Sequence, residues 1–281
     1  MQPLIRLAMG TASAALLGFA GNARADVVET RELAETIPAP AGEPLVVIVK
    51  NVMGPIRVTG YDGNNVEMRA TETVRGDLQA DIERARTEMG LRTESEPGRV
   101  AFRVRPFDEG GGRRNWGWDG YSIEYDIEVR VPRGATIDVG TVNDGDVTVE
   151  DVNGEFELHN VNGGVRLVRA GGSGSVRTVN GDVDASFARA PSQATSFHTV
   201  NGELDVTFPE NLSAELAFHT MHGDVYTDFD VASLSEPPEV RRTGGRYVMN
   251  TNRSSVFRVG TGGERHTFNT LNGEIYVRKA K

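Results

Sequence analysis

The stretch Thr199-Val200-Asn201-Gly202-Glu203-Leu204-Asp205-Val206-Thr207-Phe208 recurs along the chain in close copies. Each copy centres on an Asn-Gly pair or a variant of it. The corner positions of these copies are Asn143, Asn162, Asn180, Asn201, His222 and Asn272. Successive corners are 18 to 21 residues apart, except that the last copy follows after 50 residues. A nearly fixed period of this length indicates a repeat architecture.

Each repeat contains two short runs in which apolar and polar residues alternate. One run follows the corner, as in Asp182 to Phe187, and the other precedes the next corner, as in Thr195 to Val200. Alternation with a period of two over five to seven residues predicts a half-buried β-strand. A second turn, marked by Gly171-Gly172 or Pro191, separates the two runs.

Two architectures fit two strands and two turns per repeat. In a hairpin meander, Asn-Gly would form tight reversals. In a solenoid, successive coils stack, and identical residues lie about 4.8 Å apart, one coil above the next. Stacking explains why the same residues return at alternate turns, and it lets the Asn amides bond to one another. We therefore expect an all-β, single-domain parallel β-solenoid of about six short two-strand coils, with one packed helix in the N-terminal half.

The pattern leaves the phase of the corner open. Apolar residues three positions after each Asn and Phe residues four positions before it should face the core. Strict alternation then places Thr199 and Asn201 inside and Val200 outside. A left-handed conformation at Asn201 would instead bury Val200.

The first 25 residues are typical of a secretory signal peptide. Arg6 supplies a positive start, residues 7–21 are apolar and small, and Ala23-Arg24-Ala25 fits a cleavage site. The apolar run is too short to span a membrane, and no later segment approaches that length. We expect an exported protein that is periplasmic or extracellular, at the cell surface.

The remaining chain is divided by composition. Residues 26–44 are polar with two prolines and are interpreted as a mobile lead-in linker, and residues 45–281 as the solenoid. Within the solenoid we expect a helix at 77–90, a loop at 108–120 and a surface insertion at 230–255. The predicted helix carries an apolar stripe of Leu78, Ile82, Ala85 and Met89.

Composition excludes several classes of function. The chain has no Cys, which excludes disulfides, Cys-ligated zinc, thiol nucleophiles and a lipoprotein anchor. A formal charge of −10 argues against a general nucleic-acid binder, which needs a basic surface. No phosphate-binding loop, Gly-x-Ser-x-Gly elbow or His-Glu-x-x-His helix is present.

One glycine-rich loop concentrates both tryptophans of the chain together with arginines. Exposed aromatic and Arg side chains can bind a sugar face or a protein partner. The alternative is a connection whose aromatic residues fold onto the body. The candidate ligand-binding residues of this loop are Arg113, Arg114, Trp116, Trp118 and Tyr121.

Acidic residues recur just after the corners, at Asp182, Glu203, Asp224, Glu274, Asp184 and Asp205. Stacked carboxylates repel one another, and Ca²⁺ would relieve that repulsion. A solvated acidic face explains the same pattern, and no compact calcium-binding loop is present. The expected cofactor is therefore none. A polysaccharide-active enzyme could use Asp182, Asp184, Glu203 and Asp205 as a carboxylate pair, but acids in every coil look like a product of the repeat.

Three histidines precede the corners by three residues: His159, His198 and His219, with Arg177 in the same column. His198 and His219, expected in adjacent coils, could bind a transition metal together with His222, or respond to pH. Stacking on the surface explains the column equally well. We therefore predict no metal site.

These repeats, preceded by Val131-Pro132-Arg133-Gly134-Ala135 and an N-terminal strand–helix segment, resemble the bacterial putative-adhesin family of exported β-solenoid proteins. The resemblance covers about residues 45–279, and the 50-residue gap departs from it as a lost or irregular coil. It implies a non-enzymatic envelope or surface protein that binds a cell-envelope glycan or protein, or its own copies. A polysaccharide-active enzyme and a periplasmic envelope-stress sensing module remain as alternatives. Ligand, oligomeric state and handedness stay open.

Overall fold

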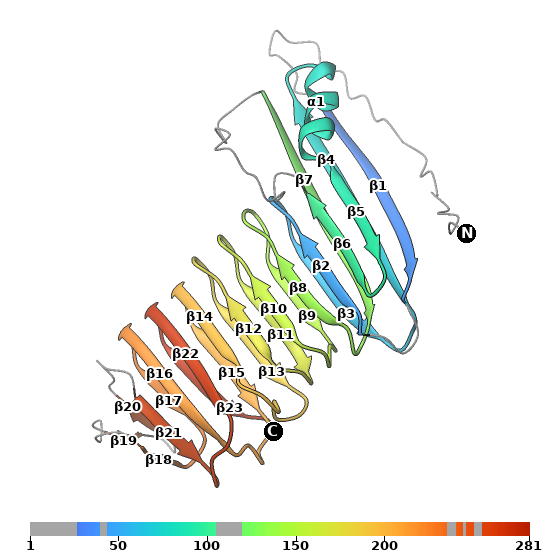
Figure 1. The fold of residues 1–281 in the computed structure, drawn as a ribbon. Helices are drawn as coiled ribbons and strands as arrows, with labels where there is room; N and C mark the ends of the chain where they lie inside the picture. Colours follow the sequence, from blue (N-terminus) through green and yellow to red (C-terminus); the bar gives the residue numbers. More distant parts are fainter. Residues whose placement is uncertain (1–26, 40–43, 105–119, 235–239, 244–245, 250–254) are drawn as a thin grey trace.

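The computed structural model of the protein describes residues 27–39, 44–104, 120–234, 240–243, 246–249 and 255–281. In this part of the chain, two sheets face each other and the backbone coils from one to the other (Figure 1). Sheet A has the strand order β1-β4-β7-β3-β9-β11-β13-β15-β23-β17-β20-β19, and sheet B has the order β18-β21-β16-β22-β14-β12-β10-β8-β2-β6-β5. The fold is the predicted all-β parallel solenoid with one packed helix.

Each coil places one strand in sheet B and the next strand in sheet A. Parallel pairs join β12 (Gly174–Arg177) to β14 (Ser196–Asn201) and β13 (Val183–Phe187) to β15 (Leu204–Phe208). Parallel pairing excludes the hairpin meander, whose neighbouring strands are antiparallel. The other coils are β2 (Val46–Lys50) with β3 (Ile56–Tyr61), β8 (Thr136–Gly140) with β9 (Val147–Glu150), β10 (Phe156–His159) with β11 (Val165–Ala170), β16 (Ala214–His222) with β17 (Val225–Thr227), and β22 (Arg265–Asn272) with β23 (Ile275–Lys279).

The last coil of the chain does not lie at the end of the solenoid. β22 lies between β14 and β16, and β23 lies between β15 and β17. The buried rings show the same order, because Phe268 stacks on Phe197 at a centroid distance of 5.2 Å and on Phe218 at 5.1 Å. The 50-residue gap is therefore not a lost coil. It is the length of chain that leaves the stack and returns one position earlier.

The corners form a continuous hydrogen-bonded ladder on the surface. The Nδ2 of each Asn donates to the Oδ1 of the Asn in the preceding coil over 2.7–2.9 Å. In spatial order, the hydrogen-bonded corner residues are Asn143, Asn162, Asn180, Asn201 and Asn272, and His222 occupies the next corner position in register.

The phase of the corner combines parts of both predicted alternatives. Thr199 is fully buried, and its Oγ1 donates to the carbonyl oxygen of Gly181 over 2.9 Å. Val200 is only half-buried, which disagrees with the alternative in which a left-handed Asn201 buries it. Asn201 is exposed, although strict alternation predicts it inside. The backbone bends at Gly202, with φ +155°, and not at the Asn.

Close approach of neighbouring coils explains the Gly of each corner. A Cβ at Gly202 would lie 2.1 Å from the carbonyl oxygen of Gly181, and a Cβ at Gly181 would lie 2.2 Å from that of Gly163. Such distances are far inside van der Waals contact. Only Gly allows the coils to stack at this corner.

The N-terminal segment differs from the prediction. Residues expected as a mobile lead-in form β1 (Val27–Pro38), which pairs antiparallel over its full length with β4 (Asn65–Gly76). β4 pairs in turn with β7 (Tyr121–Pro132), also antiparallel, so it does not continue the coils. The polar composition of β1 is misleading because backbone pairing with β4 supplies order that its side chains do not encode.

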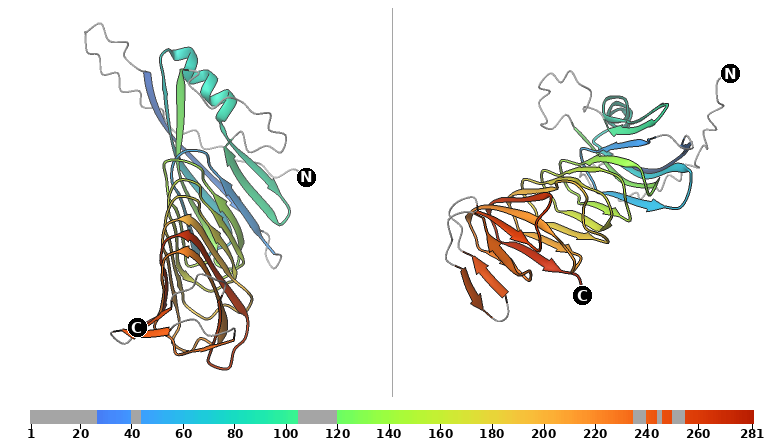
Figure 2. Two further views of the ribbon diagram at one scale, coloured as in Figure 1. Left: turned by 90° about the vertical axis from the view of Figure 1, so that its left-hand side faces the viewer. Right: turned by 60° about the horizontal axis from the view of Figure 1, so that its bottom comes forward.

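α1 (Gln79–Met89) packs against these long strands at the N-terminal end of the solenoid (Figure 2). Ile82 and Ala85 are buried, as predicted, whereas Leu78 precedes the helix and is exposed. The chain then forms β5 (Leu91–Glu96) and β6 (Arg99–Val104), which pair antiparallel.

A buried carboxylate holds the helix to the strands. Glu72 of β4 is fully buried and accepts hydrogen bonds from Arg31 of β1 (2.7 Å), Arg86 of α1 (2.8 Å) and Tyr125 of β7 (2.8 Å). A buried charge needs such partners. Burial, with Glu72 as a second cause, raises the pKa of Tyr125, so its hydroxyl stays protonated and donates.

The insertion at 230–255 extends both sheets at the C-terminal end of the stack. In the part that the structure describes, it forms β18 (Val231–Ser233), β19 (Val240–Thr243), β20 (Arg246–Met249) and the start of β21 (Ser255–Val259). β21 pairs antiparallel with β16, and β20 with β17. These strands pair with the outer edges of β16 and β17, the coil at the end of the stack, and so protect the exposed end of the solenoid.

We expect Gly202→Ala to destabilise the protein by about 3 kcal/mol, because the added methyl group overlaps the Gly181 carbonyl. Gly134→Ala is the matched control, since a Cβ there meets no atom within 4 Å. Urea denaturation followed by circular dichroism measures both. Equal stability of the two variants would contradict close stacking at the corner.

His266 should make the fold sensitive to acid. The side chain is buried in β22, with Nδ1 2.9 Å from Thr195 Oγ1, and burial lowers its pKa to about 4 from the ordinary 6.5. The unfolded chain therefore takes up the proton first, and stability is lost as pH falls from 6.5 toward 4. The difference corresponds to about 3 kcal/mol. Urea titrations at several pH values should show this loss in the native chain and a smaller loss in His266→Gln. Identical pH profiles would refute the assignment.

Candidate functional site

The outer face of sheet B carries a column of basic and polar residues that runs along the solenoid. Strand register brings one residue from each coil into line, starting with Lys50 of β2. In spatial order, the column contains Lys50, Gly140, His159, Arg177, His198, Asn269 and His219. His198 and His219 are therefore not in adjacent coils, as the sequence suggests, because the intercalated strand β22 places Asn269 between them.

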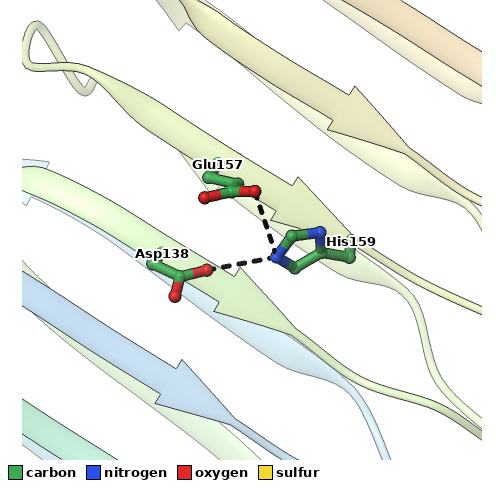
Figure 3. Close-up of side chains that lie close together, drawn as sticks. All are labelled: Asp138, Glu157 and His159. Atoms are coloured by element: carbon green, nitrogen blue, oxygen red, sulfur yellow. Dashed lines mark hydrogen bonds and ion pairs between the residues drawn. The ribbon is translucent and has the colours of Figure 1, made fainter.

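At the N-terminal end of this column, His159 meets two carboxylates (Figure 3). Its Nε2 lies 3.2 Å from Asp138 Oδ1 and 4.0 Å from Glu157 Oε1. Asp138 comes from β8, while Glu157 and His159 are two positions apart on β10, so all three side chains point outward. One His and two carboxylates within 4.8 Å form a donor set that could hold a zinc ion.

Lys50 balances this cluster without a metal. Its Nζ lies 2.5 Å from Asp138 Oδ1, the same oxygen that faces His159. Hydrogen bonds from His159 and Lys50 outweigh the opposing effect of burial and lower the pKa of Asp138. An ammonium group therefore already lies on the oxygen that a metal would need. The geometry favours a charge-balanced surface cluster that joins three coils.

Beyond this cluster, the outer face of sheet B carries an apolar column beside the basic and polar one. From β12 to β16 the basic column continues as Arg177, His198, Asn269 and His219, and the next outward column toward the corner is apolar. We call these two columns together the corner face; its apolar members are Val179, Val200, Leu271 and Met221. Met221 is 56% exposed and Val179 38%.

The corner face contains no carboxylate. In the four strands that form it, the one acidic residue is Glu215, which lies at the other end of β16 and pairs with Arg265 at 2.7 Å. Arg177 forms no ion pair with any residue that the structure describes. Burial and the charge of Arg177 lower the pKa of His198, so this ring is largely neutral at pH 7. The face combines one free cation, weakly basic rings and exposed apolar groups.

The acidic columns lie on sheet A, beyond the corner. Arginine balances two of their members, which share one column: Arg166 lies 3.0 Å from Asp184, and Arg278 lies 2.7 Å from Asp205. Asp182 instead accepts a hydrogen bond from the backbone N–H of Glu203. Three of the carboxylates considered for calcium or catalysis, Asp182, Asp184 and Asp205, thus have protein donors.

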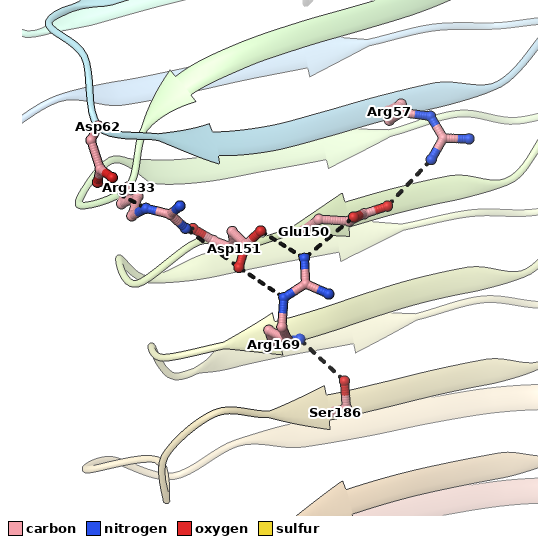
Figure 4. Close-up of polar contacts among 7 residues, drawn as sticks. All are labelled: Arg57, Asp62, Arg133, Glu150, Asp151, Arg169 and Ser186. Atoms are coloured by element: carbon pink, nitrogen blue, oxygen red, sulfur yellow. Dashed lines mark hydrogen bonds and ion pairs between the residues drawn. The ribbon is translucent and has the colours of Figure 1, made fainter.

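A second charged group joins consecutive coils at the other corner (Figure 4). Its members are Arg57, Asp62, Arg133, Glu150, Asp151, Arg169 and Ser186. Asp151 and Arg169 adopt left-handed φ values of 59° and 53°, and Arg169 binds Asp151 at 2.7 Å. The hydrogen bond from Arg169 lowers the pKa of Asp151. The charged side chains of this group pair with one another, so we interpret the group as a structural link between coils.

The predicted tryptophan loop is only partly described. Arg113, Arg114, Trp116 and Trp118 lie outside the described residues, so their role as a ligand site stays a prediction. Tyr121 begins β7, where its hydroxyl donates to Glu88 of α1 over 2.8 Å and its ring lies under Arg84. These contacts give Tyr121 a structural role in holding α1.

Sequence reasoning missed Lys50, Asp138 and Glu157. Each lies on a strand with the expected alternation, but in separate coils, and the earliest coil lacks the Asn-Gly corner. Aligning the coils on their buried Val columns would place Lys50 in register with His159, and this signal could have revealed the cluster.

We expect Asp138→Asn to destabilise the protein by about 1 kcal/mol, because the half-buried Lys50 loses its anionic partner. Glu157→Gln is the matched control, since Glu157 is 55% exposed and 4.0 Å from His159, and should have nearly no effect. Chemical denaturation at pH 7 measures both. An equal loss in the two variants would contradict the central position of Asp138.

Comparison with solved structures finds low similarity over most of the chain. A solved putative cell adhesion protein from Clostridium sporogenes is similar over 90% of this chain and 100% of its own, with 12% identity and a TM-score of 0.46. A putative adhesin from Bacteroides fragilis is similar over 89% of this chain and 97% of its own, with 8% identity and a TM-score of 0.27. A putative lipid binding protein from Parabacteroides distasonis is similar over 90% of this chain and 97% of its own, with 12% identity and a TM-score of 0.27.

No curated protein matches the chain, and none of the described helices has the length and apolarity to cross a membrane. The sequence model of the Toastrack DUF4097 family matches residues 126–255, from within β7 to the start of β21. This segment is therefore similar to a Toastrack domain.

Proposed function

We propose that this chain is a non-enzymatic, adhesin-like scaffold of the cell envelope that binds an acidic glycan through the corner face. The observation that carries this proposal is the absence of carboxylates from the corner face in a chain with a formal charge of −10. A surface free of acids is where an anionic partner meets the least repulsion.

The spacing of the corner face favours an extended partner. Parallel strands repeat Arg177, His198, Asn269 and His219 at intervals of about 4.8 Å. A linear acidic polymer can follow this column, with an acid group facing Arg177 and its hydroxyl groups facing the imidazole and amide groups of the other coils. The adjacent Val, Leu and Met side chains can cover its apolar parts. Such a surface gains affinity from several contacts along the polymer rather than from one deep pocket.

The occupied acids of sheet A support binding over polysaccharide cleavage. A glycosidase needs one carboxyl group free to protonate the substrate and a second free to attack it or activate water. Asp184 and Asp205 are held by arginines. The alternative of an envelope-stress sensing module depends on a membrane partner and remains a separate hypothesis.

Export is part of the proposal and depends on the predicted signal peptide. β1 begins at Val27, two residues after Ala25, the last residue of the predicted signal peptide. Cleavage there would leave the first strand intact. N-terminal sequencing of the protein recovered from a cell fraction tests this point.

The binding test compares two single-charge variants. We expect Arg177→Ser to weaken binding to immobilised polygalacturonate about tenfold, because it removes the free cation of the corner face. Arg166→Ser removes the same charge from sheet A and should leave affinity unchanged. Surface plasmon resonance at low and high salt measures both, and added salt should weaken the native complex.

Neutral dextran is the ligand control. Equal binding to dextran and polygalacturonate would contradict recognition of acid groups. Loss of binding in both variants would assign the effect to net charge and not to the corner face.

A further inference from the structure

We propose that the terminal coil, residues 265–281, can be exchanged between two copies of this chain. It carries β22 and β23 and lies between two coils that are consecutive in the sequence. This inference does not depend on the proposed ligand. The partner that it identifies is a second copy of the same protein.

The terminal coil occupies the slot between the β14–β15 coil and the β16–β17 coil, and it forms backbone hydrogen bonds with the strand edges on both sides. On one side, the backbone N–H of Gly202 donates to Asn272 and that of Leu204 to Glu274, each over 3.0 Å. On the other side, Gly273 donates to His222 over 3.0 Å. Leaving the slot would expose both edges, and an unpaired strand edge is satisfied by another strand.

The two neighbouring coils carry the same residue columns as the terminal coil. Phe197, Phe268 and Phe218 share one buried column. A buried Thr column follows the same register with Thr199, Thr270 and Thr220, and the corner glycines are Gly202, Gly273 and Gly223. Nothing in these columns distinguishes a terminal coil of the same chain from that of another copy.

A glycine-rich hinge precedes the terminal coil. Residues 260–264 connect β21 on one edge of β16 to β22 on the other edge, so the chain reverses around β16. Gly260 and Gly262 adopt φ values of 59° and 86° to make this reversal, and Ser213 Oγ holds it through the Gly262 carbonyl. If the hinge straightens, its five residues span at most about 17 Å. β21 can then stay on its own β16 while β22 enters another copy.

Reciprocal exchange would form a two-fold dimer with unchanged contacts at each slot. The bond from Asn272 to Asn201 and the ion pair from Arg278 to Asp205 would join different copies. Because both forms make the same contacts, protein concentration and hinge strain decide between them.

The test uses the absence of Cys from the chain. Chains carrying N201C alone and N272C alone are mixed, unfolded in urea, refolded together and oxidised. Exchange places these two positions side by side in different chains, so we expect a disulfide-linked heterodimer. Its yield should increase as the refolding concentration increases from about 1 to about 100 µM.

Two controls make the result decisive. N162C and N180C occupy adjacent coils outside the exchanged segment, and their mixture should give no heterodimer above the random background. The double variant N201C/N272C should form the bond within one chain at low concentration, which shows that the geometry allows it. A heterodimer yield equal to the N162C and N180C background would overturn the proposal.

A hinge variant provides an independent readout without Cys. Deleting Gly262 and Gly263 prevents the reversal around β16 and should shift the refolded protein from monomer to dimer in light scattering after size exclusion. A folded protein that stays entirely monomeric at about 100 µM would also overturn the proposal.

Discussion

The structure depends on how closely the backbones of neighbouring coils approach at the Asn-Gly corner. A side chain at Gly202 would overlap the Gly181 carbonyl, so glycine is required wherever coils stack there. Thr199, three residues earlier, donates to the same Gly181 carbonyl, and on the outside the amide of Asn201 donates to Asn180. Three residues within a stretch of four, Thr199, Asn201 and Gly202, thus satisfy the inside, the outside and the backbone of one corner.

This corner also separates charge on the two sheets. Acidic residues follow the glycine and enter sheet A, where arginines balance Asp184 and Asp205. Residues before the corner enter sheet B, where the corner face has no carboxylate. A repeat that needs the same backbone in every coil leaves its outward positions free to vary. Those positions can therefore differ between the two faces without cost to stacking.

The intercalated terminal coil follows from the same regularity. The coils on either side of the terminal coil carry the same Phe, Thr and Gly columns as the terminal coil itself, so local pairing does not impose the order of the chain on the order of the stack. The antiparallel strands β20 and β21 then occupy the outer edges of β17 and β16. The strands that follow, β22 and β23, consequently pair with the inner edges of β16 and β17.

The repeat at 18 to 21 residues was sufficient to predict the parallel solenoid, the Asn ladder and the inward Phe residues, because these follow from a local pattern repeated in register. The helix was also predicted from its own apolar stripe. In contrast, β1 pairs with β4, which is distant in the sequence, so no local pattern predicts this pairing. The polar composition of β1 favoured a linker. The cluster of Lys50, Asp138 and His159 comes from three separate coils.

The coil and its corner are therefore encoded locally, since the requirements for Gly, Thr and Asn act within a few residues of one another. Which coil lies beside which, and hence which outward side chains meet, is settled in the complete fold, because stacking is equally favourable between any two equivalent coils. The order of the stack is set by the connections and by the antiparallel strands at its ends, which are properties of the whole chain.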